Sequence, residues 1–363
     1  MKKINVGLLF GGRSGEHEVS LNSAFAIASS LDKEKYNVVP IAIAKNGQWF
    51  APIKIEDIKS FSPDNYRGQE VTILPQPNTK LIKLEKYEPL INLDVIFPII
   101  HGTNGEDGTL QGLLEMVDIP YVGAGVAGSA VGMDKVFMKK IFAYNKLPQV
   151  NFSYVLRSEI ENDISNIINK LINELKFPLF VKPANLGSSV GVSKAKNEAE
   201  LKKALLEASK YDRKIIIEEG KEVREIEVSV LGNEQPQASI PGEIIPCNEF
   251  YDYKAKYIDD KSILEIPAKL DKKTVNELQK LAVDTYLALD CAGLARVDFF
   301  ICKSTGKIYI NEINTLPGFT AISMYPKLWE YTGVSMPQLL DRLISLAFDR
   351  YRDKNKNITN YTL

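Results

Sequence analysis

Hydrophobic residues follow two different spacings along the first third of the chain. An apolar run over 4–10 is typical of a buried strand, and helical spacing follows from about 19 to 31. Further strands are predicted over 37–44 and 94–100, separated by a polar, irregular stretch from about 52 to 90. Alternation of strands and helices favours a parallel sheet with right-handed crossovers. The chain is therefore predicted to begin with an open α/β sheet.

The order of elements changes twice further along the chain. Helices and strands stay interleaved to about residue 220, and strands then dominate as far as Ile266. We therefore expect an α/β protein of three domains, over about 1–127, 128–220 and 221–363. The predicted helices are 106–117, 133–144, 163–176, 198–209, 275–289 and 337–351, and the further strands are 178–182, 190–194 and 214–219.

Two acidic strands near the C-terminal end carry the clearest chemical signal. Gly306 indicates a hairpin turn between them. If residues 304–306 form a three-residue loop, the residue numbers of the two partners in every facing pair of the ladder add up to the same value. Asp298 then faces Glu312 on one side of the sheet, because side chains alternate with period two.

Such a pair of carboxylates, about 5 Å apart, repels strongly unless a cation lies between them. Asn314 faces Arg296 one pair further and adds an amide oxygen. Hard oxygen ligands suit Mg²⁺, which takes its remaining ligands from waters and phosphates. The hairpin therefore predicts a metal site for nucleotide phosphates. The alternative is a polar hairpin face turned to solvent, with Arg296 neutralising one acid.

A second signal is Lys182, which lies in an apolar strand before a Gly/Ser-rich loop over 184–191. A lysine in so apolar a strand needs an anionic partner. Small residues let backbone N–H groups approach phosphate oxygens closely. The order of residues is not that of a Walker loop. The sequence predicts a phosphate-binding loop, and the alternative is a tight β-hairpin with a snorkelling lysine.

Acidic residues also end the β-branched strand 215–217, where Glu218 and Glu219 follow, with Glu225 and Glu227 a little beyond. Such a strand can present backbone groups to an adenine edge and a carboxylate to ribose hydroxyls. An edge strand with exposed acids explains the pattern equally well.

The loop 11–20 joins the first strand to the first helix. Its helix start favours a carboxylate, and Glu16 in the same turn can hold an ammonium group. Together these needs describe an amino acid, although acids that merely cap the helix are the alternative. His101 lies where strand 94–100 ends, at the usual ligand edge of a parallel sheet. A lone histidine there is more often structural.

Aromatic and basic residues alternate over 250–257, a pattern that can bind single-stranded nucleic acid. The net charge of −1 argues against nucleic acid, and a lid over phosphates fits better. No apolar run approaches the roughly 20 residues that span a bilayer, and no signal peptide is recognised. Three cysteines without ligand spacing are expected to be reduced. We expect a cytoplasmic protein.

Taken together, these motifs resemble those of D-alanine–D-alanine ligases of the ATP-grasp superfamily, over about 3–349. The specific parts are the motifs Gly-Gly-x-Ser-x-Glu-x-Glu-Val-Ser and His-Gly-x-x-Gly-Glu-Asp-Gly-Thr-x-Gln-Gly, and the acidic hairpin with Thr-x-Pro-Gly after it. Their positions are 11–20, 101–112 and 296–318, together with Met133-Asp134-Lys135, the Lys182–Ser188 loop and the Tyr251–Tyr257 lid.

This resemblance implies a fold with an N-terminal parallel sheet and a two-part ATP-grasp unit, and it implies a role for each motif residue. Glu16, linked through Ser188 to Tyr257, would bind the first D-alanine near His101. ATP would meet Lys135, Lys182, Ser188, Ser189, Glu218, Glu219 and Glu225. Two Mg²⁺ or Mn²⁺ ions would meet Asp298, Glu312 and Asn314. Arg296 and the Gly318 amide would stabilise an oxyanion, Lys256 would touch the transferred phosphate, and Ser323 with Met324 would face the second D-alanine.

The implied reaction is ATP-dependent joining of two D-alanines through an acyl phosphate, for peptidoglycan precursors. Ligases for D-Ala-D-Ser, and less closely D-Ala-D-lactate, share the ATP motifs and stay open as alternatives, although Tyr257 favours a dipeptide product. A catalytically silent nucleotide-binding regulator would be a different class of protein. The presence of Arg296 and of all the expected metal-binding residues argues against it. The resemblance also implies a homodimer and raises K⁺ as a further cofactor, and the sequence itself tests neither.

Overall fold

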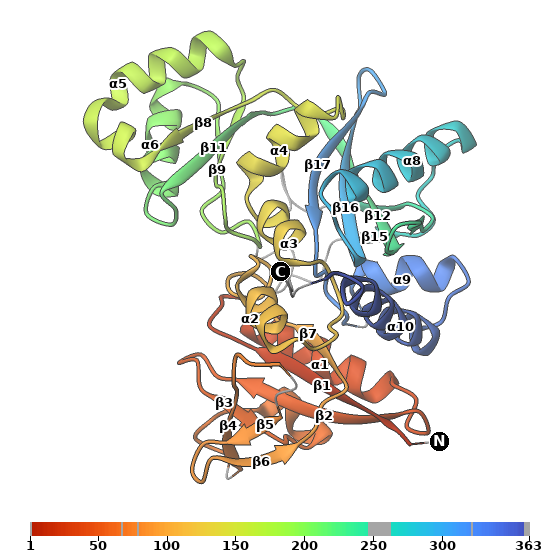
Figure 1. Ribbon diagram of the computed structural model, residues 1–363. Coiled ribbons are helices and arrows are strands. Elements are labelled where there is room, and N and C mark those ends of the chain that lie inside the picture. Colours follow the sequence, from red (N-terminus) through yellow and green to blue (C-terminus); the bar gives the residue numbers. More distant parts are fainter. Residues whose placement is uncertain (1, 67, 78–79, 246–262, 321, 359–363) are drawn as a thin grey trace.

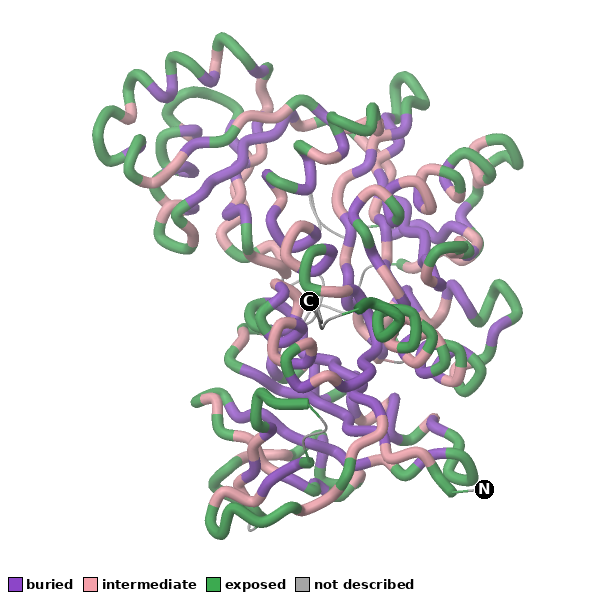
Figure 2. Tube along the Cα trace, viewed as in Figure 1, coloured by how far each residue is buried: buried purple, intermediate pink, exposed green. Residues whose placement is uncertain are grey.

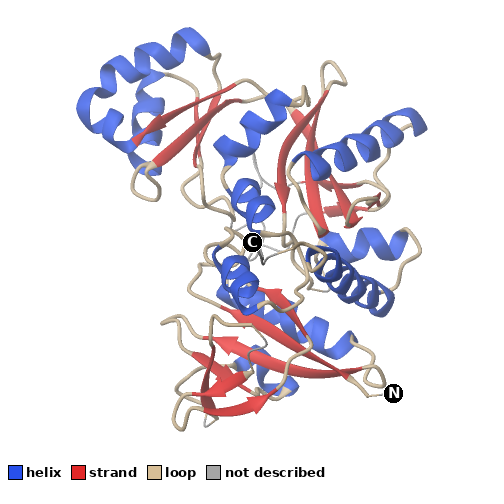
Figure 3. Ribbon diagram, viewed as in Figure 1, coloured by secondary structure: helices blue, strands red, loops and turns tan. Residues whose placement is uncertain are grey.

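Three β-sheets, each packed against helices, form three lobes that meet near the middle of the molecule (Figures 1 and 3). The computed structural model describes residues 2–66, 68–77, 80–245, 263–320 and 322–358. The α/β class predicted from the sequence is confirmed. No helix in this part of the chain is long and apolar enough to span a membrane.

The first sheet has seven strands in the order β6-β5-β4-β3-β2-β1-β7. β1 pairs in parallel with β2 and β7, as predicted, and the remaining pairs are antiparallel. The strands are β1 (Ile4–Gly11), β2 (Tyr36–Ile43), β3 (Trp49–Ala51), β4 (Gln69–Ile73), β5 (Leu81–Lys83), β6 (Glu88–Ile91) and β7 (Val95–Ile99), and the helices are α1 (His17–Ser30), η1 (Ile55–Ser60) and α2 (Thr109–Val117).

The prediction of an irregular stretch over 52–90 was wrong. That stretch contains η1 and the strands β4, β5 and β6, each strand only three to five residues long. Such short strands show too little alternation to be recognised in sequence, and they form here because each extends the edge of an existing sheet.

The second sheet has the order β10-β9-β11-β8 and is antiparallel between all its neighbours. Its strands are β8 (Phe152–Leu156), β9 (Leu179–Pro183), β10 (Ser193–Ala195) and β11 (Lys214–Glu219), and α5 (Arg157–Glu174) and α6 (Glu198–Ala208) pack on it. β11 is an internal strand, and both acids that end it are buried, so the alternative of an exposed edge strand is wrong.

Helix boundaries differ from the predictions where acidic side chains cap a new helix. The region expected to form one helix over 133–144 is two, α3 (Val126–Met133) and α4 (Lys135–Tyr144). The Asp134 carboxylate accepts hydrogen bonds from the N–H groups of Val136 and Phe137, at 3.0 and 3.1 Å, and so starts α4. α5 begins before the predicted residue 163, where Asp163 instead interrupts the helix.

The third sheet contains the acidic hairpin and has the order β15-β14-β12-β16-β17, with β13 beside β12. Its strands are β12 (Val223–Gly232), β13 (Gln237–Ala238), β14 (Gly242–Ile245), β15 (Ile263–Glu265), β16 (Gly293–Cys302) and β17 (Ile308–Asn314), and the helices that follow in this region are α8 (Lys272–Ala288), α9 (Met324–Tyr331) and α10 (Met336–Lys354). α9 was not predicted. Of the three cysteines, Cys291 and Cys302 are free buried thiols, as expected, and Cys247 lies outside the described residues.

The buried cores connect the lobes (Figure 2). One face of the first sheet packs on α1 and also on α9 and α10, which come from the C-terminal end of the chain. α4 packs on the third sheet together with α8. Segments far apart in the sequence therefore share cores, and this holds the first and third lobes against each other around the site described next.

Candidate functional site

A cavity of about 880 Å³ opens where the first and third lobes meet the loop after β9. It is lined by polar and charged groups from all three lobes, among them Glu16, His101, Lys135, Ser188, Glu227, Arg296, Glu312, Asn314, Gly318, Ser323 and Met324. Ten of these residues were predicted from sequence as site residues, and the fold brings them to one cavity. His101 and Glu227 are mostly buried, so the cavity reaches well into the protein.

Three carboxylates form a row across the third sheet. Glu227 on β12 faces Asp298 on β16, and Asp298 faces Glu312 on β17. Asn314 lies beside Arg296, one pair further along. The predicted pairing of Asp298 with Glu312 and of Arg296 with Asn314 is thereby confirmed. Glu227 was missed as a site residue, although it is the third acid of the row.

A β-bulge at Asn311 sets which residues reach this row. Between Asp298 and Phe299 the register shifts, so Phe299 faces Ile310 and Asn311 is the extra residue. The prediction of a three-residue hairpin loop was therefore wrong. The register predicted from that loop does not hold for the residue pairs near the turn. The bulge changes the alternation of β17, so that Ile310 and Ile313 are both buried while Glu312 lines the cavity. The three-residue spacing of those isoleucines was the signal in the sequence.

Arg296 lies at the centre of the row. Its Nε and Nη2 donate to the two Asp298 oxygens at 2.7 and 2.8 Å, and Nε lies 3.0 Å from Glu227. Asn314 also donates to Asp298, at 2.9 Å. Neutralisation of one acid by Arg296 was part of the alternative interpretation and is present. The solvent-facing hairpin of that alternative is wrong, since Arg296 and Glu312 line the cavity.

The oxygen atoms of this row of carboxylates are suitable ligands for a divalent cation. Its three carboxylates face two cationic side chains, Arg296 and Lys135, whose Nζ lies 3.3 Å from Glu312. The excess negative charge and the oxygen donors suit a hard cation. Within the described part of the chain, no three His, Cys, Asp or Glu side chains already converge as a metal site.

Lysines of two elements converge beside the row. Lys182 on β9 lies 2.6 Å from one oxygen of Glu218, and Lys139 on α4 lies 2.9 Å from the other. Lys139, with 1% of its side chain exposed, was missed by sequence reasoning. Its helical position gave no signal, because a lysine on α4 is ordinary until α4 packs against β11. The anionic partner expected for Lys182 is thus Glu218.

Electrostatics hold Glu218 ionised. Burial alone would raise the pKa of this carboxyl, but Lys139 and Lys182 outweigh it and lower the pKa to about 2. Glu219 points to the opposite face, because side chains alternate along β11. Its carboxylate accepts from the Lys176 N–H at 3.1 Å. Only Glu218 of this pair therefore joins the lysine cluster.

The loop after β9 connects it to β10 in an antiparallel pair, as in the hairpin alternative. The long connection and the ion pair of Lys182 with Glu218 contradict its tight turn and its snorkelling lysine. Two serines of the loop, Ser188 and Ser189, have positive φ angles of 52° and 58°. Left-handed backbone costs energy for residues other than glycine and is common at functional sites. Lys135 reaches this loop and donates to the Leu186 carbonyl at 3.1 Å. The loop thus lies over the lysines.

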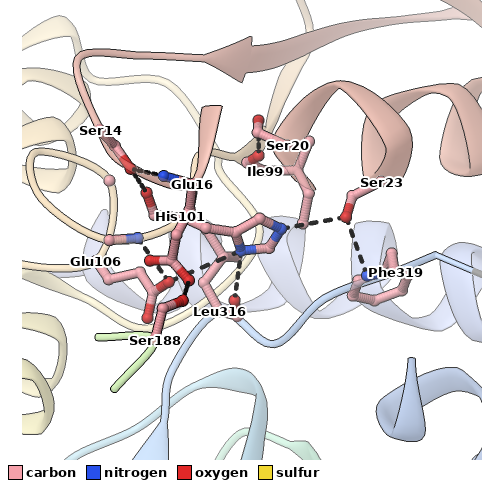
Figure 4. Close-up of polar contacts among 12 residues, drawn as sticks. Ser14, Glu16, Ser20, Ser23, Ile99, His101, Glu106, Ser188, Leu316 and Phe319 are labelled. Carbon is pink, nitrogen blue, oxygen red and sulfur yellow. Dashed lines mark hydrogen bonds and ion pairs between the residues drawn. The ribbon is translucent and has the colours of Figure 1, made fainter. Parts of the chain in front are cut away.

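Glu16 meets Ser188 across the cavity (Figure 4). The Ser188 hydroxyl donates a hydrogen bond to the Glu16 carboxylate, joining the first lobe to the second. Glu16 occupies the position before α1, but its side chain makes no capping hydrogen bond. The alternative of an acid that merely caps the helix is therefore wrong. A Cβ at Gly187 would lie 3.3 Å from a Glu16 carboxylate oxygen, so a larger residue there would crowd this contact.

His101 is buried and polar contacts surround it. Its Nδ1 lies 3.1 Å from the Leu316 carbonyl, and its Nε2 lies 3.1 Å from the Ser23 hydroxyl (Figure 4). Burial would lower the pKa of His101, but the Glu106 carboxylate, 3.7 Å from Nδ1, outweighs it and raises that pKa. The structure thus gives His101 a structural setting as well as a place in the cavity wall.

The segment after β17 completes the cavity. Ser323 accepts from the Thr320 N–H at 3.0 Å and contacts the Thr320 hydroxyl at 2.7 Å. Met324 follows as the first residue of α9 and is buried. A Cβ at Gly318 would lie 2.8 Å from the Ser323 hydroxyl, so a larger residue there would displace the Ser323 side chain. Glu225 lies on β12, two residues before Glu227 and on the same face. Lys256 and Tyr257 of the expected lid lie outside the described residues.

Family models match nearly the whole chain. The model described as "D-ala D-ala ligase N-terminus" matches residues 5–124, and "D-ala D-ala ligase C-terminus" matches residues 141–345. A D-alanine–D-alanine ligase of Natranaerobius thermophilus is 51% identical, over 100% of both chains. One of a Thermoanaerobacter species is also 51% identical, over 98% of this chain and 99% of the relative.

Solved structures agree with these sequence matches. A D-alanine–D-alanine ligase of Coxiella burnetii superposes with a TM-score of 0.86 at 37% identity, covering 98% of this chain and 97% of that one. The VanG D-Ala:D-Ser ligase of Enterococcus faecalis superposes with a TM-score of 0.87 at 34% identity, covering 95% of this chain and all of the other. The likeness therefore extends through all three lobes.

Proposed function

The chain belongs to the D-alanine–D-alanine ligase family, and from this premise we propose how its residues divide the work of the reaction. It is an enzyme that joins two D-alanines at the expense of ATP, with a divalent metal, for peptidoglycan synthesis. The observation that carries the assignment of roles is the cavity in which Glu16, Lys135 and Gly318 meet from separate elements.

Glu16 is the residue that binds the ammonium group of the first D-alanine. Its carboxylate lies in the cavity and is oriented by the Ser188 hydroxyl. His101, in the adjacent wall, shapes the same subsite. Closure of the Ser188 loop over a bound amino acid excludes water, which matters because acyl phosphates hydrolyse readily.

Lys135 and Lys182 bind the phosphates of ATP. Lys182 is oriented by Glu218, and Lys135 by Glu312 and the Leu186 carbonyl. The backbone of the Ser188–Ser189 loop contributes N–H donors to the phosphate oxygens. Glu218 and Glu225, with the backbone at Glu219, meet the adenosine. Lys256 and Tyr257 keep their proposed roles at the transferred phosphate and the first substrate, on resemblance alone.

Asp298, Glu312 and Asn314 would hold two Mg²⁺ ions, with Mn²⁺ as a substitute. When bound, the metal offsets charge on the phosphates as the substrate carboxylate attacks the γ-phosphorus. Arg296, which donates to Asp298, lines the cavity and is proposed to stabilise the oxyanion. K⁺ is a further activator whose site no described residue identifies.

The second half of the reaction uses the segment after β17. The amine of the second D-alanine attacks the acyl phosphate, and the Gly318 N–H with Arg296 stabilises the tetrahedral oxyanion. Ser323 and Met324 face this second substrate. D-Ser remains the second candidate, supported by the fold's likeness to a D-Ala:D-Ser ligase.

The same resemblance extends to organisation. The three sheets fall within 1–127, 128–220 and 221–363, which supports these limits as domains, although α9 and α10 share a core with the first. We also propose a homodimer that acts in the cytoplasm, where ATP is available, on small-molecule substrates without nucleic acid.

ADP release from purified protein with Mg²⁺-ATP tests the proposal. D-Ala alone, D-Ala with D-Ser, D-Ala with D-lactate, and L-Ala are compared, and products are identified by mass. D-Ala-dependent release that yields mainly D-Ala-D-Ala is expected. If D-Ala-D-Ser or D-Ala-D-lactate is the main product, the corresponding ligase activity would be assigned to the protein instead. Absence of turnover with every D-amino acid would overturn the substrate assignment.

A further inference from the structure

Ser23 connects two lobes from inside α1. It is fully buried, and its hydroxyl oxygen accepts from the Phe319 N–H at 3.3 Å (Figure 4). The same oxygen lies 3.1 Å from His101 Nε2. Ser23 thus joins the first helix to the segment after β17, nearly 300 residues later in the chain.

The chemistry of the groups involved determines which atom donates and which accepts in each hydrogen bond. The Leu316 carbonyl only accepts, so His101 Nδ1 carries a hydrogen and donates to it. In a neutral ring the Ser23 hydroxyl donates to Nε2, and in a charged ring Nε2 donates to Ser23. The Phe319 N–H donates to Ser23 in both cases. The link through Ser23 therefore persists in either protonation state of His101.

Both ends of the turn 316–319 are thereby held by the first lobe. His101 holds the Leu316 carbonyl and Ser23 holds the Phe319 N–H. Gly318 lies between these two points and lines the cavity. Among the described residues, the Gly318 N–H has no acceptor. The turn is thus fixed while its central donor stays available to a ligand.

We propose that Ser23 is a positioning residue that sets the Gly318 N–H for the second half of the reaction, and this rests on the oxyanion role proposed for Gly318. Electrostatic stabilisation of an oxyanion needs donors whose positions are already fixed. A misplacement of about 1 Å is enough to slow a reaction markedly. Transfer of the γ-phosphoryl group does not use this turn, so the two half-reactions separate.

Loss of the Ser23 hydroxyl should therefore uncouple the two half-reactions. In the second half, the amine nitrogen forms a bond to the acyl carbon, the bond from that carbon to phosphate oxygen breaks, and the amine loses a proton. If capture is slow, the acyl phosphate survives longer, escapes and is hydrolysed by water to D-alanine and phosphate. ATP is then consumed without dipeptide.

The test is the ratio of phosphate released to dipeptide formed in Ser23→Ala. We expect this ratio to rise at least twofold above the wild-type value, with the KM for ATP changed less than twofold. Ser23→Cys keeps the size and a weak donor, and should give an intermediate ratio. The ratio is measured per turnover, so a smaller folded fraction does not alter it.

Ser20 provides a matched control. It is equally buried on α1, but its hydroxyl bonds to the Gly11 N–H and the Ile99 carbonyl, both within the first sheet. Ser20→Ala should lower stability and leave the ratio unchanged. An unchanged ratio in Ser23→Ala, or an equal rise in Ser20→Ala, would overturn the positioning role. Failure of the wild type to form any dipeptide would instead overturn the proposed function.

Discussion

Lys139 and Glu218 form an ion pair 2.9 Å long between α4 and β11, and both side chains are almost completely buried. The second oxygen of Glu218 binds Lys182 in the same way. One carboxylate thus serves two lysines, only one of which lies on the strand that reaches the phosphate loop. Lys139 supports the position of Lys182 through Glu218.

Replacement of Lys139 by methionine should weaken both stability and ATP binding. Removal of one partner of a buried ion pair costs about 3 kcal/mol or more when the remaining charge is left unpaired, but Glu218 here keeps Lys182, so the loss should be smaller. We expect that loss in urea unfolding and a severalfold rise in the KM for ATP. Lys140→Met, on the adjacent exposed lysine, is the control and should change neither. Equal effects at both positions would contradict the role of Lys139.

Stability should depend on the ionisation of Glu218 at acidic pH. Its pKa is lowered from 4.5 to about 2, so the carboxylate stabilises the folded protein above about pH 4.5. This contribution is lost as the pH falls through about 2. The difference in unfolding free energy between the wild type and Glu218→Gln should therefore shrink from pH 6 to pH 3.

Exposed Glu161 serves as the control for that measurement. Glu161→Gln should leave the unfolding free energy within about 0.5 kcal/mol at both pH values, as is usual for surface substitutions. A difference for Glu218→Gln that stays constant between pH 6 and pH 3 would show that Glu218 does not titrate as described.

Deletion of Asn311 tests the bulge. Without the extra residue, β17 would alternate regularly, so Glu312 would still face Asp298 while Ile310 and Ile313 stay in the core. We therefore expect the deletion variant to fold and to retain activity, measured by urea unfolding and by ADP release with D-Ala. Asn311→Ala keeps the residue count and is the control, which should retain most activity. Loss of folding in the deletion variant alone would show that Asn311 is needed for more than the extra position in the ladder.

Ser188→Ala should raise the KM for the first D-alanine. The hydroxyl orients Glu16, and a hydrogen bond to a charged group contributes about 1.5–3 kcal/mol, so a rise of about tenfold is expected. Steady-state kinetics with varied D-alanine at saturating ATP measure it. Ser193→Ala, at the start of β10 in the same hairpin, is the control and should leave this KM unchanged. An unchanged KM for D-alanine in Ser188→Ala would show that Ser188 has no role in binding the first substrate.

Local patterns in the sequence determined much of this protein. Runs of apolar or β-branched residues predicted β1, β2, β7 and β11, and the acidic hairpin predicted that Asp298 faces Glu312, because pairing across a hairpin depends on nearby residues. The motifs around Glu16 and Lys182 identified the chemistry. In each case the signal lies within one or two adjacent elements.

Only the tertiary structure decided the rest. Lys139 meets Glu218 because α4 packs beside β11, and Ser23 meets Phe319 because the first and third lobes share a core with α9 and α10. The bulge at Asn311 is also a result of packing, since it lets Ile310 and Ile313 be buried together. These contacts join residues far apart in the chain or depend on burial. The spacing of Ile310 and Ile313 is a local signal for the bulge, but the sequence alone does not determine these features, because their stability comes from surfaces that meet only in the folded protein.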